Sequence, residues 1–239
     1  SKRDLYDFEE EVEKLASSLS SPLIVVRGLR RTGKTSLILT SLEESSSTYL
    51  FLDLREACRS RRDFYTILSR EASSFMSKYS SKRRFLEAFK RALRRLRGVS
   101  LAGVEVSISW GRDRPLISEV LRELSAFAAE EKTRIIIVLD EAQRLEGVVR
   151  DEVLNALAYA YDHLEGLTFI ISGSEVGVLE GIFNNPASPL FGRAFIEVST
   201  RKLTREEALD FLKQGLREVG VQVPEEELRR AAELLDGII

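Results

Sequence analysis

The sequence is poor in the residues that form disulfides and zinc clusters. Among its 239 residues are one cysteine, Cys58, and one histidine, His163. A single cysteine cannot form a disulfide within the chain, and these two residues are too few for a zinc site with the usual ligands. The scarcity of cysteine is typical of a reducing compartment. We therefore look for the chemistry of the protein in other side chains.

Long apolar segments are also missing. No run of the sequence approaches the roughly 20 apolar residues that span a membrane, and residues 1–13 carry too many charges for a signal peptide. The 36 Lys and Arg against 38 Asp and Glu give a formal net charge of -2, which excludes a chain that is basic overall and a disordered acidic one. We expect a soluble, cytoplasmic protein without membrane contact.

The apolar pattern along the chain indicates an α/β fold. A length of 239 residues corresponds to one or two domains, at about 150 residues each. Short apolar runs alternate with segments of helical spacing, such as 116–127 and 148–164. Five of these runs are candidate strands: 23–26, 49–54, 135–139, 167–171 and 194–198. This alternation is typical of a mostly parallel sheet with helices on its faces.

Two regions interrupt the alternation. Residues 64–96 have helical spacing, and residues 104–110 alternate between apolar and polar as in a half-exposed hairpin, with its turn near Ala102 and Gly103. After residue 204 the pattern gives two more helices, 204–219 and 224–235. We expect a core over residues 1–200 with a helical and hairpin insertion at about 60–112. Residues 201–239 are expected to begin a helical lid that continues toward a further domain.

The strongest motif lies between the first candidate strand and the next helix. Residues 28–35 read Gly-Leu-Arg-Arg-Thr-Gly-Lys-Thr and match the phosphate-loop pattern G-x-x-x-x-G-K-[ST]. The backbone N–H groups of such a loop and the positive end of its helix bind phosphate oxygens. We expect Lys34 to reach the β- and γ-phosphates and Thr35 to bind Mg²⁺. The predicted nucleotide-binding residues are Gly28, Arg30, Arg31, Thr32, Gly33, Lys34, Thr35 and Ser36.

A second motif is the acidic end of the apolar run 135–139. Asp140 and Glu141 follow it directly and, by strand alternation, point in different directions. With Thr35, Asp140 is the candidate metal residue and would orient Mg²⁺ through water, and Glu141 is the candidate base that polarises the attacking water. Taken alone, the pair could equally be a solvated strand end. The phosphate loop upstream favours the metal-binding interpretation.

Three further residues are candidates for the catalytic site. Ser172 and Ser174 follow the strand 167–171, where their hydroxyls could sense the γ-phosphate or hold the water, although serines also simply end strands. Arg193 precedes the last candidate strand and could supply positive charge to the transition state. A surface arginine without a catalytic role is the alternative.

The helical stretch 82–97 is rich in positive charge. A solvated helix face is the favoured interpretation, and a site for nucleic acid or an acidic protein is the alternative. Its eight cations flank an apolar stripe and are Lys82, Arg83, Arg84, Lys90, Arg91, Arg94, Arg95 and Arg97.

The set of motifs resembles the archaeal AAA-type ATPases that are grouped with the STAND signalling NTPases and are close to the origin-recognition ATPases. The resemblance covers essentially the whole chain. Five segments carry it in the family's order: 28–35, 139–143, 172–177, 188–193 and 234–237.

The resemblance implies a P-loop core whose parallel sheet has the strand order 5-1-4-3-2. It also implies a small helical lid after the fifth strand and a winged-helix domain beyond the lid. In this family Glu141 would be the catalytic glutamate and Ser172 or Ser174 the sensor. Arg193 would be an arginine that touches the phosphates, either in its own chain or from a neighbour.

These observations lead to two functional hypotheses. The first is a Mg²⁺-dependent ATPase switch whose ATP and ADP states differ in lid position and assembly, including a nucleotide-dependent oligomer. The alternative is an adaptor that binds DNA or a protein client through helix 82–97 or a further domain, with little or no hydrolysis. A P-loop kinase would not need Glu141 beside Asp140. GTPases read guanine with Asn-Lys-x-Asp, which does not occur at any of the asparagines, Asn155, Asn184 and Asn185, so ATP is favoured.

Overall fold

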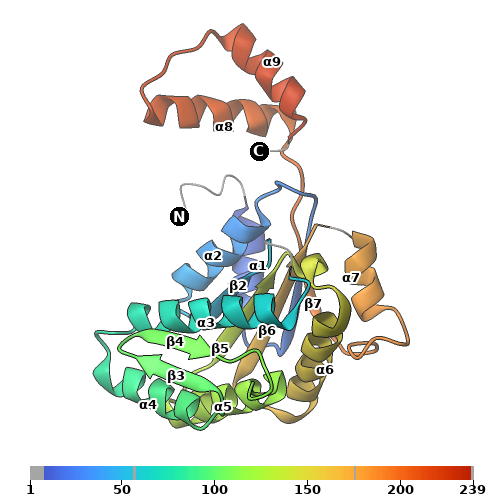
Figure 1. The fold of residues 1–239 in the computed structure, drawn as a ribbon. Helices are drawn as coiled ribbons and strands as arrows, with labels where there is room; N and C mark the ends of the chain where they lie inside the picture. Colours follow the sequence, from blue (N-terminus) through green and yellow to red (C-terminus); the bar gives the residue numbers. More distant parts are fainter. Residues whose placement is uncertain (1–7, 56–57, 175, 238–239) are drawn as a thin grey trace.

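The computed structural model describes residues 8–55, 58–174 and 176–237, and its fold is drawn in Figure 1. Within these residues a central sheet of five parallel strands has the order β2-β5-β6-β1-β7. Counted along the chain and read from the β7 edge, this is the predicted order 5-1-4-3-2, so the α/β fold class is confirmed. The strands are β1 (Leu23–Arg27), β2 (Thr48–Asp53), β5 (Ile135–Asp140), β6 (Leu167–Gly173) and β7 (Ile196–Ser199).

Helices cover both faces of the sheet because successive strand residues point to opposite sides. Leu23 and Val25 of β1 pack into one apolar cluster, whereas Ile24 and Val26 pack into the other. The helices α1 (Glu9–Ser18) and α2 (Lys34–Glu44) contribute to the second cluster. Three helices with residues in the first cluster are α5 (Ile117–Glu130), α6 (Gly147–His163) and α7 (Val176–Phe183).

The segment between β2 and α5 forms a helical pair and a hairpin on the same side as α5 (Figure 1). Its elements are α3 (Arg61–Lys78), α4 (Arg83–Arg94), β3 (Val99–Ala102) and β4 (Glu105–Ile108). Serine side chains of α3 hold the hairpin: Ser73 Oγ accepts from Val106 N at 2.8 Å, and Ser69 Oγ accepts from Ile108 N at 3.0 Å. These two serines satisfy strand N–H groups that β3 does not reach.

Two helices follow the last strand and stand apart from the sheet in Figure 1. They are α8 (Arg205–Glu218), whose N-cap Thr204 forms a capping box with Glu207, and α9 (Glu225–Leu235). The backbone N–H of Leu203 donates to Gly237 O at 3.1 Å, which joins the end of α9 to the segment that leaves β7. Within the described residues, the helices are all too short or too polar to cross a bilayer.

Candidate functional site

The phosphate loop leaves β1 after Arg27 and ends at Gly33, the N-cap of α2. Lys34 is only 4% exposed, and its Nζ donates to the carbonyl oxygens of Gly28 at 3.1 Å and Leu29 at 2.8 Å. Its ammonium group therefore lies inside the curve of the loop. Burial lowers the pKa of Lys34. The negative charges of Glu141 and Asp140 act in the opposite direction and raise this pKa, but burial is the larger effect.

The loop contacts the segment that leads from β7 to the lid helices. A Cβ on Gly28 would lie 1.9 Å from Oγ1 of Thr200 and 2.8 Å from Oγ1 of Thr32, so any larger residue would force both hydroxyls to move. These two hydroxyls are hydrogen-bonded to each other at 2.6 Å. Thr200 was not among the predicted residues, and it ties the phosphate loop to the segment that leads from β7 to α8.

The other predicted loop residues lie at the loop tip and in the first helical turn. Arg30 and Arg31 are exposed, and Arg31 has a left-handed backbone with φ 63°. Ser36 is partly buried in α2. Two cations and a hydroxyl thus accompany Lys34 at the positive end of α2, an arrangement that suits an anionic ligand.

The acidic end of β5 meets the phosphate loop. Asp140 is fully buried, and its Oδ2 accepts from Oγ1 of Thr35 at 2.7 Å. Its other oxygen, Oδ1, accepts from the buried hydroxyl of Ser172 at the end of β6. Both residues predicted to bind metal, Thr35 and Asp140, are therefore in direct contact.

This donor set fits a magnesium ion held with a nucleotide. A hydroxyl and a carboxylate oxygen are hard ligands, and Mg²⁺ in nucleotide sites uses one or two such groups with phosphate oxygens and water. The described residues contain no group of three or more His, Cys, Asp or Glu that could hold a metal by itself. Thr35 and Asp140 would hold the ion only together with the triphosphate.

Glu141 turns away from the strand and has its own hydrogen-bond partners. Its backbone is left-handed, with φ 57°, and its Oε2 accepts from Ser174 Oγ at 3.2 Å and from Nε2 of Gln143. The two candidate sensor serines thus contact different carboxylates, Ser172 that of Asp140 and Ser174 that of Glu141. Glu175, which follows them in the motif, lies outside the described residues.

Arg193 is not brought to the phosphate loop. Its Nε donates to Oδ1 of Asp162 at 3.1 Å, its Nη1 donates to the carbonyl of Pro189, and its guanidinium lies 5.8 Å from the ring centroid of Tyr161. Asp162 and Tyr161 belong to the last turn of α6. In this structure the guanidinium of Arg193 is thus bound at the end of α6, and its predicted contact with the phosphates, in its own chain or from a neighbour, stays a prediction.

Sequence reasoning missed a charged pair beside the site. Asp53 ends β2 and is the register partner of Asp140, and Arg55 Nε donates to both Asp53 oxygens at 2.9 Å. The hydrogen bond with Arg55 is the main cause that lowers the pKa of Asp53. Because Asp53 is the penultimate residue of the predicted strand 49–54, its place at the carboxyl end of the sheet could have been inferred. The pair lines a cleft of about 430 Å³ with Thr35, Leu39, Phe51, Arg70 and Glu71.

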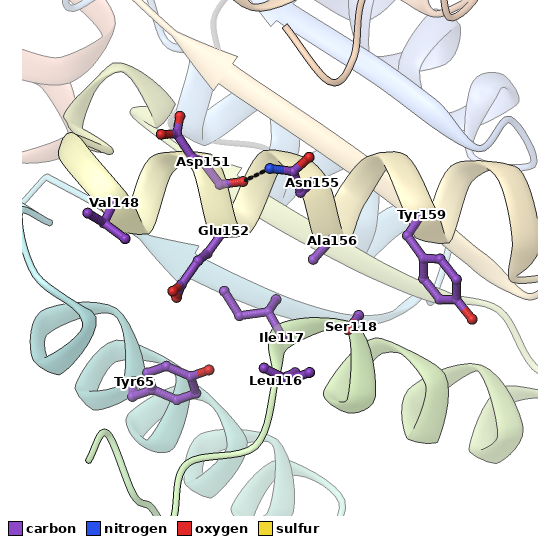
Figure 2. A pocket seen from close by; sticks show the side chains of 10 residues that line it. All are labelled: Tyr65, Leu116, Ile117, Ser118, Val148, Asp151, Glu152, Asn155, Ala156 and Tyr159. Atoms are coloured by element: carbon purple, nitrogen blue, oxygen red, sulfur yellow. Dashed lines mark hydrogen bonds between the residues drawn. The ribbon is translucent and has the colours of Figure 1, made fainter. Parts of the chain in front are cut away.

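A second cleft, of about 420 Å³, lies between α3, α5 and α6 (Figure 2). Its wall includes exposed Leu116 and Val148, and its carboxylate Glu152 is paired with Arg61 and with Arg114 at 3.4 Å. None of the predicted nucleotide-binding or catalytic residues lines this second cleft, whereas Thr35 lines the first.

Comparison with known proteins agrees with this geometry. Residues 6–239 match the sequence family described as an ATPase domain predominantly from Archaea. A Walker-type ATPase of Pyrococcus abyssi is 33% identical, with 99% of this chain and 65% of that chain covered and a TM-score of 0.75. No curated protein matches the chain.

More distant solved structures share the fold alone. The Aeropyrum pernix Orc1 protein in complex with DNA is 19% identical, and the match covers 97% of this chain and 55% of the Orc1 chain with a TM-score of 0.61. The Aeropyrum pernix Orc2 protein, in its ADPNP–ADP complexes, is 15% identical, and the match covers 96% of this chain and 57% of the Orc2 chain with a TM-score of 0.61. This chain spans less than two thirds of the length of each of these three proteins.

Proposed function

This chain belongs to the family of ATPase domains found predominantly in Archaea, and we propose that it is a Mg²⁺-dependent ATP hydrolase of the AAA and STAND type that acts as a nucleotide switch. The observation that carries the proposal is the 2.7 Å hydrogen bond from Thr35 to Asp140. It joins the phosphate loop to the acidic strand end, the two elements that must close around one magnesium-bound triphosphate.

The residues of the site divide the work of hydrolysis. The backbone N–H groups of the loop and Lys34 bind the phosphate oxygens, and Lys34 exchanges its carbonyl partners Gly28 and Leu29 for them. Thr35 and Asp140 hold Mg²⁺, which supplies positive charge to the β- and γ-phosphates when bound. Arg30, Arg31 and Ser36 add polar contacts at the loop and the first turn of α2.

Glu141 acts on the attacking water. The water oxygen forms a bond to the γ-phosphorus while the bond from that phosphorus to the bridging oxygen of ADP breaks, and the water proton passes to the Glu141 carboxylate. The Ser172 hydroxyl keeps Asp140 oriented between β5 and β6. The products are ADP and inorganic phosphate.

The contact between Thr32 and Thr200 supports a switch role. Thr200 follows β7 and leads into the segment that carries α8 and α9, so a nucleotide that moves the loop also moves the root of the lid. Arg193 is also a candidate phosphate contact. To reach a phosphate of its own chain it must break the ion pair with Asp162, and otherwise it would face the site of a neighbouring chain.

The decisive experiment compares Glu141→Gln with the parent protein in Mg²⁺ and ATP. We expect hydrolysis to fall by about 10²–10⁴-fold, because the base is lost, while ATP binding is retained. Glu105→Gln on the exposed hairpin is the matched control and should hydrolyse like the parent. Parental hydrolysis by Glu141→Gln would show that this residue is not the base.

One surface favours a second candidate function, an adaptor for DNA. On α4, Arg91, Arg95 and Lys90 are paired with Glu130, Glu123 and Glu87. Within the described part of the chain, Arg83, Arg84 and Arg94 are exposed and make no ion pair. Unpaired arginines on one helix are suited to phosphate backbones, and the Orc1 protein that shares the fold was solved with DNA.

Charge reversal tests the adaptor. The double variant Arg83→Glu with Arg84→Glu should bind a DNA duplex more weakly at about 0.05 M salt. The slope of log K against log salt should also fall by the amount expected for the loss of about two phosphate contacts. The control reverses Arg217 and Arg230 on the lid helices, which leaves α4 unchanged. If the α4 variant binds the duplex as tightly as the parent, this helix is not a DNA-binding surface.

A further inference from the structure

Gln143 forms a closed set of hydrogen bonds with the residue assigned as the base. It lies in η2 (Ala142–Arg144), directly after β5. One amide hydrogen of its Nε2 reaches Oε2 of Glu141, and the other reaches Oγ of Ser174 at 3.0 Å. The Ser174 hydroxyl donates to the same Oε2 at 3.2 Å. Each of the three donated hydrogens has one acceptor, so this orientation of the amide satisfies every donor of the set.

The opposite amide orientation does not fit. It would place the carbonyl oxygen of Gln143 against the carboxylate of Glu141, two acceptors without a hydrogen between them. In the orientation present, Oε1 of Gln143 is buried without a hydrogen-bond partner among the described residues. A buried acceptor without a partner is costly, and the two hydrogen bonds that the amide donates offset this cost.

The surroundings leave the amide little freedom. A Cβ on Gly173, the last residue of β6, would lie 2.7 Å from Oε1 of Gln143 and 3.1 Å from Cδ1 of Leu179. The side chain of Gln143 therefore occupies space that is free only because residue 173 is a glycine and has no side chain. The left-handed backbone of Glu141 places its carboxylate outside any regular element, so its orientation depends on side-chain contacts.

We propose that Gln143 is a positioning residue for Glu141. Gln143 and Ser174 anchor Oε2, while Oε1 of the carboxylate has no partner among the described residues and is left to accept the hydrogen of the attacking water. A base held by a third group is the arrangement expected of an activated nucleophile site. This inference rests on the proposed role of Glu141.

The test replaces Gln143 with methionine. Gln143→Met keeps the length of the side chain, removes both donors, and also removes the orphan oxygen, so the fold should tolerate it. We expect kcat for ATP hydrolysis to fall by about 10–100-fold, the loss typical of an outer partner. KM for ATP should not change, because Gln143 makes no hydrogen bond to the phosphate loop. Gln214→Met, on exposed α8 surface, is the matched control.

A double-mutant cycle separates positioning from a structural effect. In the Glu141→Gln background, Gln143→Met should cause no further loss, because it acts through a base that is already absent. Parental kcat for Gln143→Met, a change in KM alone, or an equal loss in both backgrounds would each overturn the proposal. Should Gln143→Met fail to fold, Ser174→Ala is measured instead. We expect its kcat to fall a few-fold, and a parental kcat would refute the proposal.

The Glu141 and Gln143 variants distinguish the base assignment from the positioning role. If Glu141→Gln hydrolyses ATP like the parent, the base assignment and the proposed function are wrong whatever Gln143 does. If Glu141→Gln is inactive and Gln143→Met has parental kcat, only the positioning role is wrong.

Discussion

The replacement of Gly28 by alanine should disturb the phosphate loop and the root of the lid together. The new Cβ would lie 1.9 Å from Oγ1 of Thr200 and 2.8 Å from Oγ1 of Thr32, and both hydroxyls would have to move. Thr200 is 7% exposed, so it has little free space. Overpacking of this kind costs about 1–3 kcal/mol, and the lost 2.6 Å hydrogen bond adds about 1 kcal/mol. The total is about 2–4 kcal/mol, which lowers Tm by about 4–16 °C in a chain of this size.

Thermal unfolding with and without Mg²⁺ and ATP measures both effects. ATP at about 100 times its Kd should stabilise the parent by about 2.7 kcal/mol, and Gly28→Ala should lose most of that increment. Gly181→Ala is the control, because a Cβ there meets nothing within 4 Å and residue 181 lies inside α7. It should leave Tm unchanged or slightly raised.

A second substitution identifies the cause. Thr200→Ala removes the oxygen at 1.9 Å and leaves the Thr200 Cβ at 3.1 Å, so Gly28→Ala with Thr200→Ala should be more stable than the sum of the single changes predicts. If Gly28→Ala unfolds at the parental Tm and keeps the full ATP shift, the close approach between the loop and Thr200 does not exist.

Three further outcomes follow from charged and buried groups. Burial raises the pKa of Cys58 to about 12, so at pH 8 its thiolate is about a thousandfold scarcer than in an unperturbed thiol, and thiol reagents should label it only on unfolding. The hydrogen bond from Arg61 lowers the pKa of Glu152, so its stabilisation is present above the unfolded pKa and lost as pH falls. Urea unfolding of Glu152→Gln should therefore vary less with pH below about 5, and an unchanged slope contradicts this. Arg193→Ala should lower kcat at least about tenfold. If the specific activity of the parent rises with protein concentration, Arg193 acts in the site of a neighbouring chain. A parental kcat for Arg193→Ala would show that the residue takes no part in hydrolysis.

The parts of the fold that could be predicted are those with a local physical signal. β5 and β6 are buried at every residue, and the apolar runs 135–139 and 169–171 within them are typical of a sheet that is covered on both faces. The phosphate loop is equally local. The contact between Thr35 and Asp140, 105 residues apart, was predictable because both residue types serve one ion.

Other features depend on contacts that no local pattern reports. The hydrogen bond between Thr32 and Thr200 spans 168 residues and involves two ordinary threonines. Gln143 follows the acidic pair in sequence, but its role requires the amide to meet Ser174 of the next strand end. Arg193 was expected near phosphate from its place before β7, yet Asp162 at the end of α6 provides the carboxylate it binds.

The strand order explains why these polar groups form one site. In the sheet, β6 lies between β5 and β1, so the acidic end of β5 and the start of the phosphate loop are two strand spacings apart. Two spacings are about 10 Å between the strand backbones. The side chains of Thr35 and Asp140 span that distance with a 2.7 Å hydrogen bond, and an ion with a phosphoryl group would fit there once this bond opens. Ser172 is the penultimate residue of the intervening strand, and its hydroxyl donates to Oδ1 of Asp140. With β5 directly beside β1, the same residues would leave a gap of about 5 Å, too narrow for a phosphoryl group and its ion.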